Sequence, residues 1–221
     1  LPISMSDYVL SKQYFVDVIK DLIPWAEERK DYFTELDSAI GDGDHGMNLS
    51  IGFREVGKNI DEWQNESVFQ FYKKVGTALL DKVGGSAGPL YGSFFMKFGL
   101  PVKKKGETDG VTFDEFIACM DKAVAIIQKR GRSTSGEKTM NDTLMPALDA
   151  LKAANAAGEA PKACMAKAVE AGKAGLESTR NMVATKGRAM RLGERAVGHL
   201  DPGAASTAEM LEIFYKNMPD A

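Results

Sequence analysis

Cysteine and histidine are scarce in this sequence. Its 221 residues contain two cysteines, Cys119 and Cys164, and two histidines, His45 and His199. The cysteines lie far apart in helix-forming segments, which argues against a disulfide framework and predicts the reduced thiols of a cytosolic protein. A lone histidine more often holds a structural hydrogen bond than performs catalysis, so neither histidine by itself indicates an active site.

Long apolar runs and a strong excess of charge of one sign are also missing. No stretch is apolar for long enough to span a bilayer, and no signal peptide is visible at the start of the chain. With 28 basic and 31 acidic side chains, the net charge is −3. A mildly acidic chain is a poor candidate for general binding to nucleic acid or to anionic membranes. We therefore expect a cytoplasmic protein without nucleic-acid or membrane partners.

A convincing alternation of apolar and polar residues, the pattern of a half-buried strand, is not found. Apolar residues recur instead at three- and four-residue spacing, which predicts amphipathic helices. Three such faces span Tyr14 to Ile23, Val68 to Leu80 and Phe113 to Ile127. About eight helices are expected, with loops near 35–45, 59–66, 83–89, 99–111, 130–138, 155–161 and 186–203. Most of these loops are short, so neighbouring helices should run antiparallel within a single domain at 5–221. Leu1 to Ser4 are assigned no function.

The stretch AIGDGDHGMN, Ala39 to Asn48, concentrates negative charge on a glycine-rich backbone. Together with Asp37 just upstream, Asp42 and Asp44 form a cluster of carboxylates that no nearby residue in the sequence neutralises. Such charges repel, so a compact fold needs a cation among them, and oxygen ligands suit magnesium or calcium rather than zinc. The acids do not have the spacing of an EF-hand. The stretch therefore predicts a metal–phosphate site, with a solvated turn as the plain alternative.

Three further segments have chemistry that suits phosphate. The glycine-rich segment KVGGSAGPLYG, Lys82 to Gly92, has backbone amides that lead into a helix. It follows a helix and lacks the Lys-Ser ending of a Walker A loop, which excludes P-loop and Rossmann sites. GRSTSGEKTMND, Gly131 to Asp142, is polar and opens a helix, and the basic segment Thr185 to Ala204 can clamp phosphate through arginine. Taken alone, the glycine-rich segment is better explained as a tight turn between helices, and a basic segment broken by glycines is usually a mobile surface.

Taken in their order, five segments resemble one known family. GDGDHGMN, VGGSAGPLYG, GEKTMND, KGRA and LGERAVGHLDPGA are similar to motifs of the L subunit, the nucleotide-binding domain, of dihydroxyacetone kinases. The resemblance extends from about Leu36 to the C-terminus. It implies an all-α fold, an antiparallel barrel of eight amphipathic helices with the nucleotide site in the loops at one end, which agrees with the helix count from periodicity.

The resemblance also implies the site residues. Asp37, Asp42 and Asp44 are expected to bind two magnesium ions that bridge the phosphates of ADP or ATP, and no residue of the chain is expected to act as a catalytic nucleophile. The expected nucleotide contacts are His45, Gly46, Met47, Asn48, Ser86, Ala87, Gly131, Met140, Arg188, Asp201, Pro202 and Gly203. His199 is expected at most to order its loop.

The function implied by the resemblance is that of half an enzyme. The chain would hold nucleotide and magnesium, and the γ-phosphoryl group would pass to dihydroxyacetone bound on a partner K subunit. In the phosphotransferase-linked form, which a free-standing chain favours, ADP stays bound and is rephosphorylated in place by an M subunit, with phosphoenolpyruvate as the phosphate source. One alternative is an ATP-dependent kinase with exchanging ATP, and another is a helical nucleotide-sensing module without turnover. The related domain of fatty-acid kinases is disfavoured, because it tends to carry threonine where His45 stands. Formation of a homodimer is left open.

Overall fold

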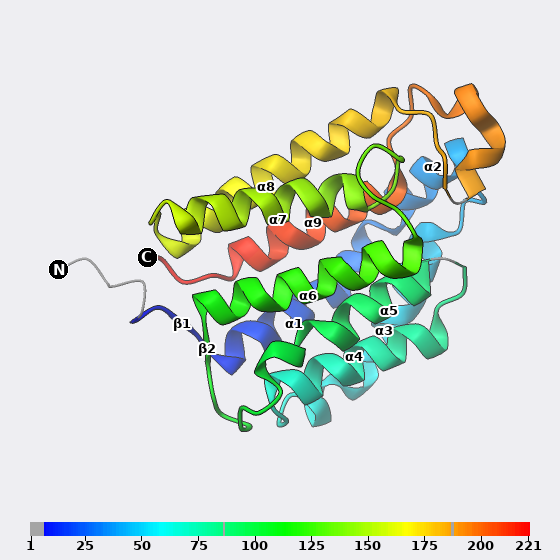
Figure 1. The fold of residues 1–221 in the computed structure, drawn as a ribbon. Helices are drawn as coiled ribbons and strands as arrows, with labels where there is room; N and C mark the ends of the chain where they lie inside the picture. The colour runs from blue at the N-terminus through cyan, green and yellow to red at the C-terminus, as the bar shows by residue number, and fades with distance from the viewer. Residues whose placement is uncertain (1–6, 86, 187) are drawn as a thin grey trace.

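The computed structural model describes residues 7–85, 87–186 and 188–221, and this part of the chain is mostly helical (Figure 1). It contains nine α-helices: α1 (Lys12–Glu28), α2 (Lys30–Ile40), α3 (His45–Trp63), α4 (Val68–Lys82), α5 (Ala87–Phe98), α6 (Phe113–Gly131), α7 (Asn141–Ala156), α8 (Pro161–Ser178) and α9 (Pro202–Lys216). Short 3-10 segments are η2 (Leu100–Val102), η3 (Thr179–Asn181) and η4 (Arg188–Ala196). Among the described residues, no helix combines the length and apolar character that crossing a bilayer requires.

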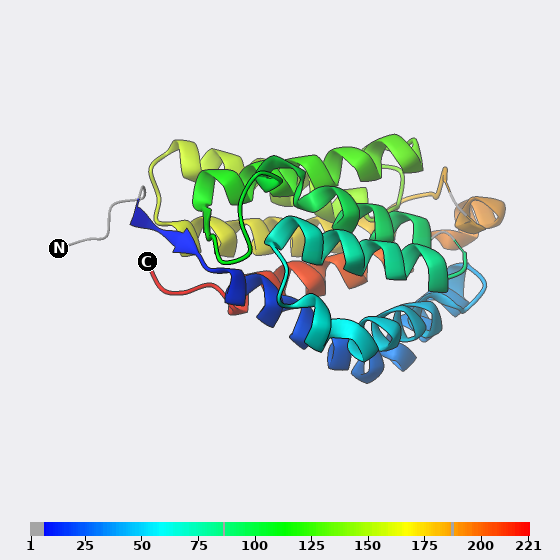
Figure 2. The same ribbon diagram turned by 90° about the horizontal axis from the view of Figure 1, so that it is seen from below.

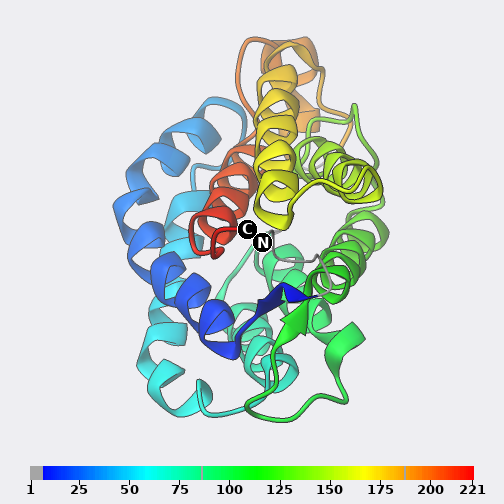
Figure 3. The ribbon, with the colours of Figure 1, turned by 90° about the vertical axis from the view of Figure 1, so that its left-hand side faces the viewer.

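The long helices form an antiparallel barrel. They lie side by side along one direction in Figure 1, and Figure 3, which looks along that direction, shows them arranged in a ring. Helices α4 and α5 pack against each other, as do α7 and α8. The first described residues, from Asp7 on, and the C-terminus lie at one end of the barrel, which we call the terminal end (Figures 1 and 2). The α2–α3, α4–α5 and α6–α7 connections and η4 lie at the opposite, loop end. The expected all-α helical barrel is confirmed.

Aromatic rings fill much of the interior. Phe98, the last residue of α5, packs against Phe116 of α6 and Phe214 of α9, with ring centroids 6.2 and 5.7 Å away. The hydroxyl of Tyr72 on α4 donates a 3.0 Å hydrogen bond to the Phe15 carbonyl of α1. All five side chains are buried. The three- and four-residue spacing of the sequence therefore marked the inward faces of these helices.

Local signals in the sequence set several helix boundaries. Thr112 and Glu115 form a capping box at the start of α6, where the Thr112 hydroxyl accepts from the Glu115 amide at 3.2 Å and the Glu115 carboxylate accepts from the Thr112 amide at 2.9 Å. The expected break near NAAGEAP lies between the end of α7 and the start of α8 at Pro161. Gly158 there has φ +79°, which glycine adopts without strain.

Three expectations about boundaries are wrong. The expected loop at 59–66 is helical as far as Trp63, the last residue of α3. The expected loop at 35–45 is helical as far as Ile40, so Asp37 lies on the last turn of α2. The first expected helix is also broken at Arg29, and this break accounts for the ninth helix. The Arg29 guanidinium donates hydrogen bonds of 2.8 and 3.0 Å to the Glu209 carboxylate of α9. An antiparallel pair of two-residue strands, β1 (Val9–Leu10) and β2 (Val111–Thr112), was also not expected, because two residues are too few to show alternation.

Candidate functional site

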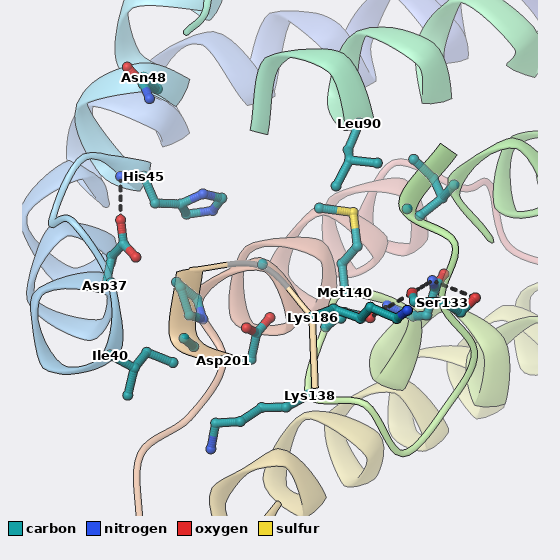
Figure 4. Close-up of a pocket in the computed structure, with 18 of the residues that line it drawn as sticks. Asp37, Ile40, His45, Asn48, Leu90, Ser133, Lys138, Met140, Lys186 and Asp201 are labelled. Carbon is teal, nitrogen blue, oxygen red and sulfur yellow. Dashed lines mark hydrogen bonds between the residues drawn. The ribbon is translucent and has the colours of Figure 1, made fainter. Parts of the chain in front are cut away.

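A pocket of about 220 Å³ opens at the loop end of the barrel. Its walls come from segments that are far apart in the sequence: the end of α2, the start of α3, α5, the α6–α7 connection, the segment before α9 and the first residues of α9. Figure 4 shows these side chains facing one space, with Asp37 and His45 on one side and Met140 and Ser133 on the other. The loops singled out in the sequence therefore converge on one pocket.

Asp37 fixes the acidic corner of this pocket. Its Oδ2 accepts hydrogen bonds from the backbone amides of Asp44 at 2.9 Å and His45 at 3.0 Å, so it closes the turn between α2 and α3. Steric constraints explain why two positions of this turn are glycine. A Cβ at Gly41 would collide with the Asp37 carboxylate, and Gly43 has φ +73°. The glycine-rich sequence thus brings the carboxylate of Asp37 close to the backbone that follows it.

Asp37 and Asp44 lie together and suit a hard cation. The pKa of Asp44 is raised, first by burial and then by its hydrogen bond and repulsion with the Asp37 carboxylate, which is the electrostatic signature of two acids that share a small space. Asp42 is exposed on the turn and does not line the pocket. Among the described residues, no three acids, histidines or cysteines converge as a ready-made metal site. The structure therefore unites two of the three predicted ligands, whose oxygen donors are of the type that magnesium prefers.

His45 opens α3 and is buried in the pocket wall. Its Nε2 lies 2.9 Å from the Ser206 hydroxyl of α9, which also accepts a 2.5 Å hydrogen bond from the Tyr91 hydroxyl of α5. Burial lowers the pKa of His45 to about 4, so the imidazole is neutral near pH 7. His45 therefore joins three helices of the loop end and lines the pocket without carrying a charge.

The residues after His45 have different positions. Gly46 is buried where α3 meets α2, and a Cβ there would collide with the Lys30 carbonyl, so this glycine permits close helix packing. Met47 is 48% exposed and lies outside the pocket wall. Asn48 is on the rim, and its amide donates to the Gly84 carbonyl at 3.3 Å, which ties α3 to the glycine-rich segment. Of the predicted contacts at 45–48, His45 and Asn48 line the pocket.

The opposite wall is apolar. Leu90 of α5, Ile127 of α6 and the buried Met140 line it, next to Gly131 at the end of α6. In Figure 4 the Leu90 and Met140 side chains point toward the same part of the pocket. A flat apolar ring can be buried against such a wall, since aliphatic side chains remove it from water without requiring a polar partner. Gly131 and Met140 were both expected in the site, and both line it.

The first turn of α9 forms the floor between the two walls. Asp201 caps the helix through a 2.8 Å hydrogen bond from the Ala204 amide to its carboxylate, and Pro202 and Gly203 follow it along the pocket. Burial raises the pKa of Asp201 to about 7. Because α3 and α9 both begin at this pocket, two helix N-termini with their positive dipole ends face it, a setting that favours phosphate.

The remaining predicted nucleotide contacts are Ser86, Ala87 and Arg188. Ser86 lies outside the described residues, Ala87 is the first residue of α5 and Arg188 is the first residue of η4. His199 contributes its main-chain carbonyl to a hydrogen bond from Lys138, and a role of its side chain in ordering the loop stays a prediction. Sequence reasoning missed Lys138, Ser206 and Tyr91, the last of which supports His45 through Ser206. Lys138 lies inside the polar segment that the sequence analysis did select.

Comparison with known proteins gives the family. Residues 39–216 match the DAK2 domain. The chain is 45% identical over 219 residues to the ADP-binding subunit of PEP-dependent dihydroxyacetone kinase 2 of Listeria innocua, covering 98% of this chain and 100% of the relative. It is 32% identical to the ADP-binding subunit of the PEP-dependent dihydroxyacetone kinase of Escherichia coli, over 83% of this chain and 86% of the relative.

Two longer proteins contain a similar region. Human triokinase/FMN cyclase is 34% identical over 84% of this chain, which corresponds to 32% of the human protein. The crystal structure of the dihydroxyacetone kinase of C. freundii superposes with a TM-score of 0.68 at 22% identity, covering 91% of this chain and 34% of that one. At this identity the superposition shows a shared fold. The expected resemblance is confirmed, and the chain belongs to the DAK2 domain family.

Proposed function

We propose that this chain is the nucleotide-holding subunit of a dihydroxyacetone kinase. It binds ADP or ATP with two magnesium ions. The γ-phosphoryl group of the bound ATP passes to dihydroxyacetone held on a partner K subunit. ADP is then rephosphorylated in place by an M subunit of the phosphotransferase system. The observation that carries this proposal is the division of one pocket into an acidic corner at Asp37 and Asp44 and an apolar wall at Leu90, Ile127 and Met140. The names of the Listeria and Escherichia relatives, which specify ADP binding and PEP dependence, support the same assignment.

The two sides of the pocket suit the two halves of a nucleotide. The apolar wall can bury an adenine ring, and the N-termini of α3 and α9 place backbone amides and positive dipole ends where phosphates would lie. Asp37 and Asp44, with Asp42 from the same turn, are the residues that would hold magnesium. When bound, the metal would neutralise negative charge on the phosphates.

The described pocket offers no good protein nucleophile. His45 is neutral, and its Nε2 is engaged with Ser206, so a phosphorylated histidine is not part of this proposal. The chain's own contribution is therefore to orient the nucleotide and to keep its phosphates in a fixed electrostatic setting, which is most of what phosphoryl transfer requires. In this proposal the acceptor is dihydroxyacetone held outside this pocket on a second subunit.

Exposed apolar side chains near the pocket support a protein partner. Met47 and Ile51, on the first two turns of α3, are 48% and 38% exposed, and Met190 of η4 is 54% exposed. Exposed large apolar groups on elements that border a site suit a surface that another protein covers. A K subunit docked at the loop end would bring its substrate to the open side of the pocket.

Reconstitution tests this function. The purified chain, a K subunit and an M subunit with its phosphate donor are combined, and dihydroxyacetone phosphate is measured. The chain alone should form no product. The complete mixture should turn over many times per bound nucleotide without added ATP. Product formation by the isolated chain would contradict the division of labour. Sustained turnover with the K subunit and ATP alone, from a chain that is purified free of ADP, would establish the ATP-dependent alternative instead.

An Asp37 variant tests the metal assignment separately. Asp37→Asn keeps an oxygen that can accept from the Asp44 and His45 amides, so the helical fold should persist by circular dichroism. Affinity for magnesium–ADP by calorimetry should fall by about a hundredfold, or about 2.8 kcal/mol. Asp31→Asn, on the exposed first turn of the same helix, is the matched control and should bind normally. Full affinity in Asp37→Asn would refute the assignment of Asp37 as a magnesium ligand.

A further inference from the structure

Lys138 is a buried lysine whose charge is satisfied by main-chain carbonyls. Only 1% of the residue is exposed. Its ammonium donates hydrogen bonds to the carbonyls of Thr179 at 2.6 Å, Ala196 at 2.9 Å and Met182 at 3.3 Å, and also to that of His199. An ammonium buried away from water is costly unless all its protons find acceptors. Four converging carbonyls provide more acceptors than the three protons require.

These four carbonyls belong to the two stems of one segment. Thr179 and Met182 follow α8, whereas Ala196 and His199 precede α9. Between the stems lie residues 183–186 and 188–195, which we call the capping segment. Its residues Lys186 and Ala189 line the pocket. The Lys138 ammonium thus joins the point where the chain enters the capping segment to the point where the chain leaves it.

The other interactions that hold the capping segment are small. Ile40 at the end of α2 forms a minor apolar cluster with Ala184 and Ala196, against which Ala189 and Leu192 pack, separate from the main core. The Thr185 amide also donates a 3.4 Å hydrogen bond to the Glu137 carbonyl. The stems are also joined by a hydrogen bond from the Gly198 amide to the Arg180 carbonyl at 2.5 Å. Three of the five members of this cluster are alanines, whose methyl groups bury little apolar surface. A charged group with four hydrogen bonds is therefore the dominant described link between the two stems.

Lys138 also connects the capping segment to the rest of the pocket. It lies two residues before Met140 of the apolar wall, and its backbone has φ +63°, a conformation uncommon for a residue other than glycine. In Figure 4 its side chain extends away from Met140 and passes below Asp201. Thr179, whose carbonyl it binds, also accepts a hydrogen bond from the Asp201 amide at 3.0 Å. One side chain thus links the apolar wall, the capping segment and the start of α9.

We propose that Lys138 is a positioning residue that holds the capping segment against the nucleotide pocket and thereby slows the release of bound nucleotide. This role rests on the proposed function, because it concerns how long ADP stays bound. A lysine suits the position since a compact ammonium can sit among four carbonyls, whereas the planar guanidinium of arginine has a fixed fork geometry. Methionine has a similar length but would leave all four carbonyls without their donor.

Release kinetics give the direct test. Dissociation of a fluorescent ADP with magnesium is followed by stopped flow for the wild-type chain, for Lys138→Met and for Lys122→Met, an exposed lysine of α6 that serves as the matched control. Lys138→Met should release the nucleotide at least about tenfold faster, while its association rate stays within about threefold, because the group holds a formed complex and does not attract the ligand. Lys122→Met should behave as wild type. An unchanged release rate in Lys138→Met would overturn the proposal.

A second measurement does not depend on nucleotide. Trypsin should cleave after Arg191 and Arg195 of the capping segment faster in nucleotide-free Lys138→Met than in nucleotide-free wild type. If the wild-type chain binds no nucleotide but this difference appears, the proposed function fails and the role of Lys138 in holding the segment stands. If nucleotide binds and neither release nor cleavage changes, the proposed function stands and the role of Lys138 is refuted.

The proposal remains testable if the methionine variant does not fold. Lys138→Gln keeps two amide protons and should show the same direction of change with a smaller size. In the wild-type chain, the Lys138 ammonium should give a nitrogen-15 NMR signal near neutral pH, because its protons are shielded from solvent exchange. A folded Lys138→Gln with wild-type release, or an ammonium that exchanges as fast as those of exposed lysines, would contradict the inference.

Discussion

The terminal end and the loop end of the barrel are held together by different kinds of contact. Toward the terminal end, Phe98, Phe116 and Phe214 bury their rings against one another, and Tyr14 donates a 2.7 Å hydrogen bond to the Phe214 carbonyl. At the loop end, the buried groups include an imidazole, an ammonium and several hydroxyls, joined by hydrogen bonds. An apolar core tolerates many substitutions that keep its volume. A buried polar network, in contrast, is favourable only when each member has its hydrogen-bond partners.

This difference shows where the molecule gains stability and where it fixes geometry. Burial of aromatic surface is a large favourable term that requires no particular donor or acceptor. Buried hydrogen bonds add little net stability but define the positions of the groups they join. The loop end therefore has a well-defined pocket at the cost of desolvating polar groups, and the aromatic core supplies the stability that this arrangement needs.

The largest expected effect tests whether the two ends are independent. Phe98→Ala removes a fully buried ring, and such truncations cost about 3–5 kcal/mol. The free energy of unfolding from urea denaturation should fall by about this amount. Affinity for magnesium–ADP, measured at low temperature where the variant is folded, should change by less than about twofold because distant sites act additively. Val9→Ala, at a half-exposed strand position, is the control for stability. An affinity that falls along with the stability would show that the two ends are coupled.

A smaller effect should appear at Asp201, and it should depend on pH. Burial raises the pKa of Asp201 to about 7 in the folded chain, from about 3.8 when it is exposed. Between these values the folded state binds a proton that the unfolded state does not, so this group's contribution to stability is fully present below about pH 4 and is lost as the pH rises toward 7. Asp201→Asn lacks this titration but can still accept from the Ala204 amide as the helix cap.

The measurement is a difference between two proteins. The free energy of unfolding of nucleotide-free Asp201→Asn, minus that of the wild type, should rise between pH 4 and 7 and level off above about pH 8. Asp201 on the pocket floor keeps some contact with solvent, so the total change is expected to be about 1–2 kcal/mol. Other titrating groups largely cancel in the difference. A difference that does not vary with pH would contradict the raised pKa of Asp201.

The features that sequence predicted well are those with a periodic or local signal. Apolar spacing marked the inward faces of α1, α4 and α6, and a threonine followed by glutamate marked the start of α6. The concentration of acids and glycines marked the acidic corner, because the collision at Gly41 is a local constraint that only glycine escapes. Asp37 was expected on a loop, but α2 carries it on its last turn, since helix ends are set by capping and packing that composition alone does not reveal.

Lys138 shows what sequence could not predict. A lysine in a polar segment is most often exposed, and here its partners are four main-chain carbonyls from residues 41 to 61 positions away. Carbonyls are present at every residue, so no side-chain pattern identifies them. Ser206 escaped notice for a related reason, because its contact with His45 joins residues 161 positions apart. Such contacts appear only when the helices are placed in three dimensions.

The smallest expected effect compares two helix caps. Thr112 caps α6 at the terminal end, where it is partly exposed and takes part in a local capping box, whereas Asp201 caps α9 at the pocket. Thr112→Ala removes one acceptor from the first turn of α6 and should lower the free energy of unfolding by about 1 kcal/mol. This loss should be independent of pH between 4 and 8, since the hydroxyl does not titrate, and ADP release should be unchanged. Thr112→Ser keeps the hydroxyl and should retain most of the stability. If Thr112→Ala altered nucleotide release, a local cap at the terminal end would be acting on the pocket through the length of α6, and the separation of roles between the two ends would not hold.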